Sequence, residues 1–449
     1  MPLAQHYRSL LHRLPSLAVD ADQIQVLYSA QSFKQRLLEL IAAAQQRIYL
    51  VALYLQDDAA GREILTALYE AKQANPALDI CLFVDFHRAQ RGLIGHKGQG
   101  GNHKMYQEFA DRYSQSINIY GVPVKGREVL GVLHLKGFIF DDTLLYSGAS
   151  LNDIYLHQQE RYRFDRYHQL NDAALADTMI DYMTRLFMDN PAVPSLLEAH
   201  IPSARQLRSV LRQFKPQMKR AQYQFTDEPR QTGQVSVTPL AGLGKRGNHL
   251  NRAIRTLLRS SEQQLFICTP YFNLPKPLAK DVRTLLKKGV TVTLVIGDKT
   301  ANDFYISPDE PFRTIGGLPY LYETNLRRFA RAHQTSIYQG KLNIMLWSHE
   351  RNSYHLKGMF VDDDLAMITG NNLNPRAWGL DLENGLLLQD PERLLQPCFE
   401  EEKNNILKHC KRIEHFSQIE EMADYPVPVQ RLLKRVQRTR ANVLLKRLL

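Results

Sequence analysis

Residues 133–142 read LHLKGFIFDD, and residues 354–363 read YHLKGMFVDD. Both stretches contain the phrase His-x-Lys-x4-Asp, and they lie in opposite halves of the 449-residue chain. Two matches with this spacing and with similar apolar neighbours are not expected by chance in one sequence. The repetition therefore predicts a duplicated structural unit that carries one set of reactive side chains per copy.

The sequence around each phrase is repeated as well. In both halves a helical pattern leads into an apolar strand pattern, a second helix, a second strand that ends in Asp, and a short third strand. In the first half these patterns cover residues 33–46, 47–55, 64–74, 78–85 and 117–124, and in the second half they cover residues 250–263, 264–272, 281–289, 290–298 and 342–348. Apolar strands that alternate with helices are typical of α/β folds.

The predicted fold class is therefore α/β, with two tandem lobes that each flank a sheet with helices and that are related by pseudo-two-fold symmetry. A chain of 449 residues is also too long for one ordinary hydrophobic core. We expect the first lobe at residues 1–211 and the second at residues 235–420. The polar, Pro-containing stretch 212–234 is the expected crossover linker, and a basic amphipathic helix is expected at residues 425–449.

The paired His and Lys side chains predict chemistry at a phosphorus atom. On a strand, residues two apart share a face, so His134 and Lys136 point the same way, as do His355 and Lys357. If the lobes meet at their motifs, two imidazoles and two ammonium groups form one shared site. Lysines can neutralise phosphate oxygens, while one His attacks and the other moves a proton.

Other residues of the repeat have supporting roles in this interpretation. Asp141 and Asp362 lie an odd number of residues from their His, which places them off the reactive face in a structural role. The later segments GASLN and GNNLN offer hydrogen-bond donors for a phosphate group. These donors are Ser150, Asn152, Asn372 and Asn374. The sequence has no acidic cluster with magnesium spacing, so we expect neither a metal nor another cofactor.

Charge is concentrated at the C-terminus. Lys and Arg outnumber Asp and Glu by 57 to 46, and the charged residues of the stretch 429–449 are all basic. Projected at the helical period, most of the Val and Leu residues between 429 and 444 share one face, which Arg440 and Arg447 interrupt, and four cations lie opposite. These cations are Arg431, Lys434, Arg435 and Arg438. Such a helix can lie on an anionic membrane or bind nucleic acid or ribosomes; alternatively, its apolar face docks on the protein's own core.

Two further patterns bear on location. No stretch is apolar enough to span a membrane, and the N-terminus lacks the apolar segment of a signal peptide. The four cysteines do not have the spacing of a zinc site or of a disulfide framework. We therefore expect a cytoplasmic protein.

The two motif regions, residues 134–152 and 355–374, resemble the signature of the phospholipase D superfamily, in which His-x-Lys-x4-Asp is followed by Gly-x-Ser/Asn-x-Asn. This resemblance implies a two-lobed α/β fold and a two-step reaction through a phosphohistidine. It also implies that His134 is the nucleophile and that His355 moves the proton.

In this superfamily a carboxylate downstream of each motif orients a catalytic His. The resemblance assigns this role to Glu383 in the second half, within LDLENGLLL. In the first half two residues fit, depending on the alignment of QQERYRFDRYHQL. They are Asp165 and Glu160, of which Asp165 is preferred.

Within the superfamily, further phrases resemble the bacterial phosphatidyltransferases that make phosphatidylserine from CDP-diacylglycerol and L-serine. They run along most of the chain and include VALYLQDD, YSGASLNDIYLH, TPYFNLP, GDKTANDFY and ITGNNLNPRAWGLDLEN. The resemblance implies that His134 displaces CMP and that serine then takes the phosphatidyl group, at the cytoplasmic face of the inner membrane. A phospholipase D-type hydrolase, a cardiolipin synthase or a nuclease would use the same site on another substrate. A non-catalytic nucleic-acid- or ribosome-binding protein would need neither His.

Two loops follow the second strand of each half, where ligand sites of α/β folds often lie. They read FHRAQRG at residues 86–92 and GDKTANDFY at residues 297–305. Their polar side chains are candidates for holding the cytidine, the diphosphate or the serine carboxylate. The candidates are His87, Arg88, Arg91, Lys299 and Asn302.

Overall fold

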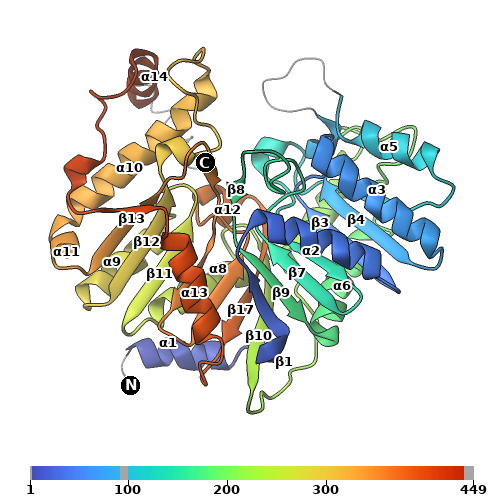
Figure 1. Cartoon of the computed structure of the whole chain (residues 1–449), viewed down its shortest axis with the longest axis horizontal. Coiled ribbons are helices and arrows are strands. Elements are labelled where there is room, and N and C mark those ends of the chain that lie inside the picture. Colours follow the sequence, from blue (N-terminus) through green and yellow to red (C-terminus); the bar gives the residue numbers. More distant parts are fainter. Residues whose placement is uncertain (1–2, 92–99, 439–449) are drawn as a thin grey trace.

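The computed structural model of the chain describes residues 3–91 and 100–438. Two large sheets lie side by side, and helices cover the outside of each (Figure 1). Helix starts follow the expected local chemistry: Ser29, Asp58 and Asp172 each cap a helix by accepting a hydrogen bond from a backbone amide of its first turn.

The first sheet has seven strands in the order β2-β9-β7-β6-β3-β4-β5. These are β2 (Ile24–Leu27), β3 (Arg47–Ala52), β4 (Asp79–Asp85), β5 (Asn118–Val122), β6 (Gly137–Phe140), β7 (Thr143–Ser147) and β9 (Tyr167–Asn171). The helices of this part of the chain are α2 (Ala30–Ala43), α3 (Ala59–Ala74), α4 (Phe86–Gln90), α5 (His103–Arg112), α6 (Ala173–Phe187) and α7 (Arg208–Arg220). Strand β4 is buried on both faces except at its first residue, as expected for a strand covered by helices.

The second sheet has nine strands in the order β1-β10-β17-β16-β15-β11-β12-β13-β18. These are β1 (Leu17–Asp20), β10 (Gln234–Leu243), β11 (Gln264–Thr269), β12 (Thr291–Gly297), β13 (Leu342–Trp347), β15 (Gly358–Val361), β16 (Leu365–Thr369), β17 (Leu382–Gln389) and β18 (Cys410–Ile413). The remaining helices are α1 (Leu3–His12), α8 (His249–Arg259), α9 (Lys276–Lys287), α10 (Leu318–Ala332), α11 (Gln334–Tyr338), α12 (Pro375–Gly379), α13 (Gln396–Leu407) and α14 (Val427–Arg438).

Six neighbouring strands have the same order and directions in both sheets. Three parallel strands, β3-β4-β5 in one sheet and β11-β12-β13 in the other, are followed by antiparallel strands toward the middle of the molecule (Figure 1). The antiparallel part is β6-β7-β9 in the first sheet and β15-β16-β17 in the second. This repetition confirms the predicted pair of α/β lobes.

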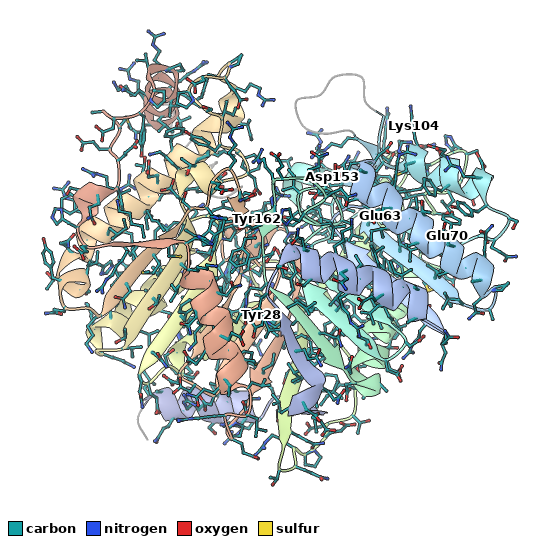
Figure 2. The ribbon with its side chains drawn as sticks, viewed as in Figure 1. Tyr28, Glu63, Glu70, Lys104, Asp153 and Tyr162 are labelled. Carbon is teal, nitrogen blue, oxygen red and sulfur yellow. The ribbon has the colours of Figure 1, made fainter. Side chains whose placement is uncertain are left out.

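The lobes share a continuous hydrophobic core at their interface. One cluster of buried side chains contains Leu135 of the first lobe together with Leu386 of the second. Two short strands, β8 (Arg163–Phe164) and β14 (Ser353–Tyr354), also pair in parallel across the interface. Figure 2 places Tyr162, next to β8, between the two halves, and its hydroxyl group lies 2.8 Å from Nδ1 of His349. The lobes are therefore one packed unit in this region.

The predicted lobe boundaries differ from the structure in two places. Strand β1 pairs antiparallel with β10, and Leu11 on α1 joins the core of the second lobe, so the N-terminal segment belongs with the second sheet. The predicted linker at residues 212–234 begins inside α7, which continues to Arg220. Its apolar residue Phe214 is buried in the shared core, so this part of the linker packs against the lobes.

Helix α14 docks on the protein through its apolar face. Val429 and Leu433 are buried beside Tyr320 of α10 and Tyr425. The cations of the predicted basic face are exposed on the opposite side; these are Arg431, Lys434, Arg435 and Arg438. Residues 439–449 of the predicted helix lie outside the described residues. Docking on the protein's own core therefore accounts for the apolar stripe of α14.

Candidate active site

The two His-x-Lys segments lie at the interface, and each one pairs with the other lobe. The backbone N–H of His134 donates to the carbonyl of Leu382 at 2.9 Å, and the N–H of His355 donates to the carbonyl of Phe164 at 2.8 Å. Each motif therefore packs against the segment that follows the other motif. This exchange places both His-x-Lys pairs at the interface between the lobes.

His134 contacts a carboxylate from the second lobe. Its Nδ1 lies 2.9 Å from Oε2 of Glu383, and the side chains are only 9% and 1% exposed. Burial, aided by the nearby charge of Lys136, lowers the pKa of His134 well below its ordinary value. Burial also raises the pKa of Glu383 to about 8. Both shifts disfavour charge on the pair, so His134 is a neutral imidazole at pH 7.

His355 contacts a carboxylate from the first lobe. Its Nδ1 lies 3.1 Å from Oδ2 of Asp165 and 2.9 Å from the hydroxyl group of Tyr155. Burial opposes ionisation of Asp165, but the charge of Lys357, whose Nζ lies 2.8 Å from Oδ2, lowers the pKa of Asp165 to about 2. Burial lowers the pKa of His355 to about 4. Of the two carboxylates that the sequence allows here, Asp165 lies beside His355, and Glu160 is exposed.

The two lysines also cross between the lobes. The side chain of Lys136 packs over Gly370 of the second lobe, and Nζ of Lys357 packs over Gly148 of the first. Lys136 is fully buried, and its Nζ has no hydrogen-bond partner among the described residues. Burial lowers its pKa to about 8. An unpaired, buried cation beside the His134 imidazole is suited to bind an anionic group.

A substitution at Gly370 tests this arrangement. A Cβ atom at this position would lie 2.7 Å from Cγ of Lys136, so Gly370→Ala is expected to displace the lysine. Since small displacements of reacting groups cost up to about 100-fold in rate, we expect turnover to fall by about 10- to 100-fold. The control is Gly126→Ala, because a Cβ at Gly126 meets nothing within 4 Å. Equal turnover of both variants would contradict the account of Lys136.

Asp141 and Asp362 occupy equivalent turns outside the site. Asp141 accepts hydrogen bonds from the backbone amides of residues 45, 46 and 47 at 2.8–3.0 Å. Asp362 accepts from those of residues 262, 263 and 264 at 2.9–3.1 Å. Both carboxylates therefore tie the hairpin after the motif to the start of a central strand, β3 or β11.

The Gly-x-Ser/Asn-x-Asn segments border the site, but two of their amides support the backbone. Oδ1 of Asn152 accepts from the amide of Tyr155 at 3.0 Å, and Oδ1 of Asn374 accepts from the amide of Ala377 at the start of α12. Ser150 is buried, and the backbone carbonyl of Asn372 accepts from Thr269. The proposed phosphate donors are thus partly engaged in shaping these turns.

The candidate ligand-binding side chains of the two loops mostly contact other parts of the protein. Nε2 of His87 lies 2.7 Å from the carbonyl of Lys125, and Arg91 pairs with Glu128. Lys299 is held by Glu323 at 3.1 Å and by Glu420 at 2.7 Å. These ion pairs already neutralise the two cations. Arg88 and Asn302 also have protein contacts: Arg88 lies over the ring of Tyr54, and Asn302 is buried with Oδ1 accepting from Phe304.

Sequence reasoning missed several polar residues around His355. Tyr155, Tyr271 and Asp303 lie close to this imidazole or to each other. Arg163 completes the group and lies in the same short segment as Asp165. For Asp303, the sequence did contain a signal, because this residue lies in the predicted ligand loop at residues 297–305.

No helix within residues 3–91 and 100–438 is long and apolar enough to cross a membrane. The same residues contain no group of three or more His, Cys, Asp or Glu side chains placed to hold a metal ion.

Comparison with known proteins identifies the family. Residues 254–402 match the family described as cardiolipin synthase, PLD-like domain. Relatives from Haemophilus influenzae and Escherichia coli, both CDP-diacylglycerol–serine O-phosphatidyltransferases, are 46% and 47% identical to this chain over 98% of its length and 97% of theirs. The crystal structure of phosphatidylserine synthase from Haemophilus influenzae superposes with a TM-score of 0.96 at 45% identity, over 99% of this chain and 100% of that one. The chain therefore belongs to the CDP-diacylglycerol–serine O-phosphatidyltransferases of the phospholipase D superfamily.

Proposed function

We propose that this protein transfers the phosphatidyl group of CDP-diacylglycerol to L-serine and releases CMP. The observation that carries the proposal is the shared site, in which each His has a carboxylate from the other lobe within 3.1 Å. Family membership over almost the whole chain supports the choice of substrates. The arrangement supplies a nucleophile, a proton carrier and cations for one reacting phosphate.

In the first step, Nε2 of His134 attacks the phosphorus atom of the phosphatidyl group. A P–N bond forms as the P–O bond to CMP breaks, and His355 gives a proton to the departing phosphate. In the second step, His355 takes the proton of the serine hydroxyl group. The serine oxygen forms a P–O bond as the P–N bond to His134 breaks. Lys136 and Lys357 offset the charge of the non-bridging oxygens in both steps.

In this proposal, each carboxylate sets the protonation state of the His that it contacts. In its ionised form, Glu383 accepts a hydrogen bond from the Nδ1–H of His134 and thereby leaves the Nε2 lone pair free to attack. Asp165 stays ionised at neutral pH and favours a proton on His355. The diphosphate of the lipid adds negative charge beside His355, which raises its pKa from the low value of the free protein.

The reaction is tested by following both products. Purified protein is incubated with CDP-diacylglycerol in detergent micelles, with and without L-serine, and CMP and lipid are quantified. We expect phosphatidylserine to form only with serine, in step with CMP. Phosphatidic acid as the main product in both samples would indicate a hydrolase instead, and no turnover at all would contradict the proposal.

We also propose that the exposed face of α14 binds anionic membranes from the cytoplasmic side of the inner membrane. Arg431, Lys434 and Arg438 are exposed, whereas Val429 and Leu433 face the protein. Replacing Arg431, Lys434 and Arg438 with Gln removes about 1 kcal/mol per charge. Binding to vesicles with anionic lipid is therefore expected to weaken by roughly 100-fold at low salt, as measured by cosedimentation.

The matched control removes three exposed cations from another surface. Arg283, Lys287 and Lys288 are exposed on and just after α9, which lies away from α14 in Figure 1. Their replacement with Gln changes net charge equally and is expected to leave vesicle binding within about twofold. Equal losses in both triple variants would contradict a specific role of α14. Loss of RNA or ribosome binding without loss of vesicle binding would assign the helix to that partner.

A further inference from the structure

An ion pair beside His355 has no role in the phosphoryl chemistry described above. Nε of Arg163, on β8 of the first lobe, lies 3.0 Å from Oδ1 of Asp303, in the loop after β12 of the second lobe. The side chains of Arg163 and Asp303 are 14% and 12% exposed to solvent. Those of the neighbouring pair, Arg166 and Glu402, are only 3% and 4% exposed. Arg163 and Asp303 are therefore partly exposed, and Oδ1 of Asp303 is a buried acceptor without a hydrogen-bond partner among the described residues, whereas Arg166 and Glu402 are buried.

Two tyrosines connect this pair to His355. The hydroxyl group of Tyr155 lies 2.9 Å from Nδ1 of His355, and the guanidinium carbon of Arg163 lies 4.6 Å from the centre of the Tyr155 ring. On the other side, Tyr271 donates to Oδ2 of Asp303 at 2.7 Å, and its ring centre lies 6.2 Å from that of His355. Both charges are thus one side chain away from the proposed proton carrier.

Arg163 retains hydrogen-bonding capacity for a ligand. Its side-chain hydrogen bond and ion pair within the described part of the chain run through Nε, to Oγ of Ser353 at 3.2 Å and to Asp303. Both terminal nitrogens are therefore available as donors, and a guanidinium favours a planar carboxylate. Burial opposes the ionisation of Asp303, but the charge of Arg163 holds its pKa below the ordinary value. The site presents one full charge of each sign.

We propose that Arg163 and Asp303 bind the acceptor amino acid, with the ammonium group on Asp303, the carboxylate on the terminal nitrogens of Arg163 and the side-chain hydroxyl group facing His355. This inference rests on the proposed transfer to serine. In serine, both charged groups lie on the carbon next to the one that carries the hydroxyl group. A pair of opposite charges beside the proton carrier can therefore orient that hydroxyl group for attack.

The same pair explains how an alcohol can be preferred over water. Water and neutral alcohols carry no charge, so they gain nothing from Asp303 or Arg163 and are not held near His355. Serine is held by two opposite charges at once, which fixes its orientation and raises its local concentration. Removal of either charge should therefore weaken the acceptor step more than the release of CMP.

The test separates the two steps. Exchange of labelled CMP into CDP-diacylglycerol reports the first step, and phosphatidylserine formation reports both. In Asp303→Asn and Arg163→Gln, we expect kcat/KM for serine to fall at least about 30-fold relative to CMP exchange, the usual minimum for breaking a buried charge contact. Matched controls are Asp309→Asn and Arg161→Gln, which alter exposed neighbours of the same charge. We expect both controls to keep the wild-type ratio.

Acceptor analogues distinguish substrate binding from a purely structural role, because a structural defect would lower activity with every acceptor. Serinamide lacks the carboxylate, and 3-hydroxypropionate lacks the ammonium group. Arg163→Gln should lose activity with serine but not with serinamide, and Asp303→Asn should lose it with serine but not with 3-hydroxypropionate, each relative to wild type. If a single variant fails to fold, the double variant removes both charges together and should show no preference for serine over either analogue.

Two results would overturn the inference. One is an equal loss of CMP exchange and serine transfer in both variants, which would make the pair a structural link between the lobes. The other is an unchanged kcat/KM for serine. Failure of the proposed function looks different, because the wild-type protein would then release no CMP from CDP-diacylglycerol or form no phosphatidylserine.

Discussion

His134→Ala is expected to lose both CMP exchange and phosphatidylserine formation. The alanine leaves no nucleophile, and removal of a nucleophile typically costs about 10⁴-fold or more in turnover. The fold should survive, because the backbone contact of this residue with Leu382 remains. Steady-state assays with labelled CDP-diacylglycerol measure both activities in one preparation.

Two further variants help to interpret the result for His134→Ala. His200→Ala changes an exposed histidine outside the site and is expected to keep wild-type turnover. His355→Ala should slow both steps, yet it retains the nucleophile and should still form some covalent intermediate. If His355→Ala loses the intermediate and His134→Ala keeps it, the roles of the two histidines are reversed.

Glu383→Gln is expected to lower CMP exchange by about 10³- to 10⁴-fold and to abolish the rise of this activity with pH below about 8. The amide can donate to Nδ1 and so favour the wrong tautomer of His134, which is the reason that comparable substitutions are costly. Burial raises the pKa of Glu383 to about 8, so the protonated form dominates below that pH and the carboxylate above it. In the wild-type protein, CMP exchange should therefore rise with pH toward about 8 as Glu383 ionises. It should fall above that pH, because burial also lowers the pKa of Lys136 to about 8 and this side chain then loses its charge.

Asp165→Asn provides the contrasting pH profile. The charge of Lys357 outweighs burial and lowers the pKa of Asp165 to about 2, so this carboxylate is ionised across the whole range of the assay. The variant should lose activity but keep the rise toward pH 8 that comes from the ionisation of Glu383. A rise that persists in Glu383→Gln and disappears in Asp165→Asn would contradict the assignment of the two carboxylates.

The duplicated motif predicted the fold because a repeated pattern of strands and helices has direct structural meaning. The strand rule placed His134 on the same face as Lys136 in the prediction, but in the structure both residues lie just before β6 and not within a strand. Repeated strand and helix patterns likewise predicted two sheets with equivalent strands. The odd separation of Asp141 from His134 predicted a position off the reactive face, and the carboxylate indeed binds backbone amides.

Features that depend on contacts between distant segments could not be predicted in this way. The pairing of β1 with β10 places the N-terminal segment with the second sheet, and a periodic pattern does not specify its partner. Lys299 lies in a predicted ligand loop, but Glu420 and Glu323 neutralise it from elsewhere in the chain. Arg163 and Asp303 come from different lobes, so their proximity to His355 required the folded structure.

The measurement that tests the central claim most directly is the identification of the residue that carries the phosphatidyl group. Protein mixed with CDP-diacylglycerol and no serine is quenched at a pH that preserves P–N bonds, digested and examined by mass spectrometry. We predict a phosphatidyl adduct on the peptide that contains His134 and its loss when serine is added before the quench. An adduct on the His355 peptide, or turnover to phosphatidylserine without any adduct, would contradict a shared site in which His134 is the nucleophile.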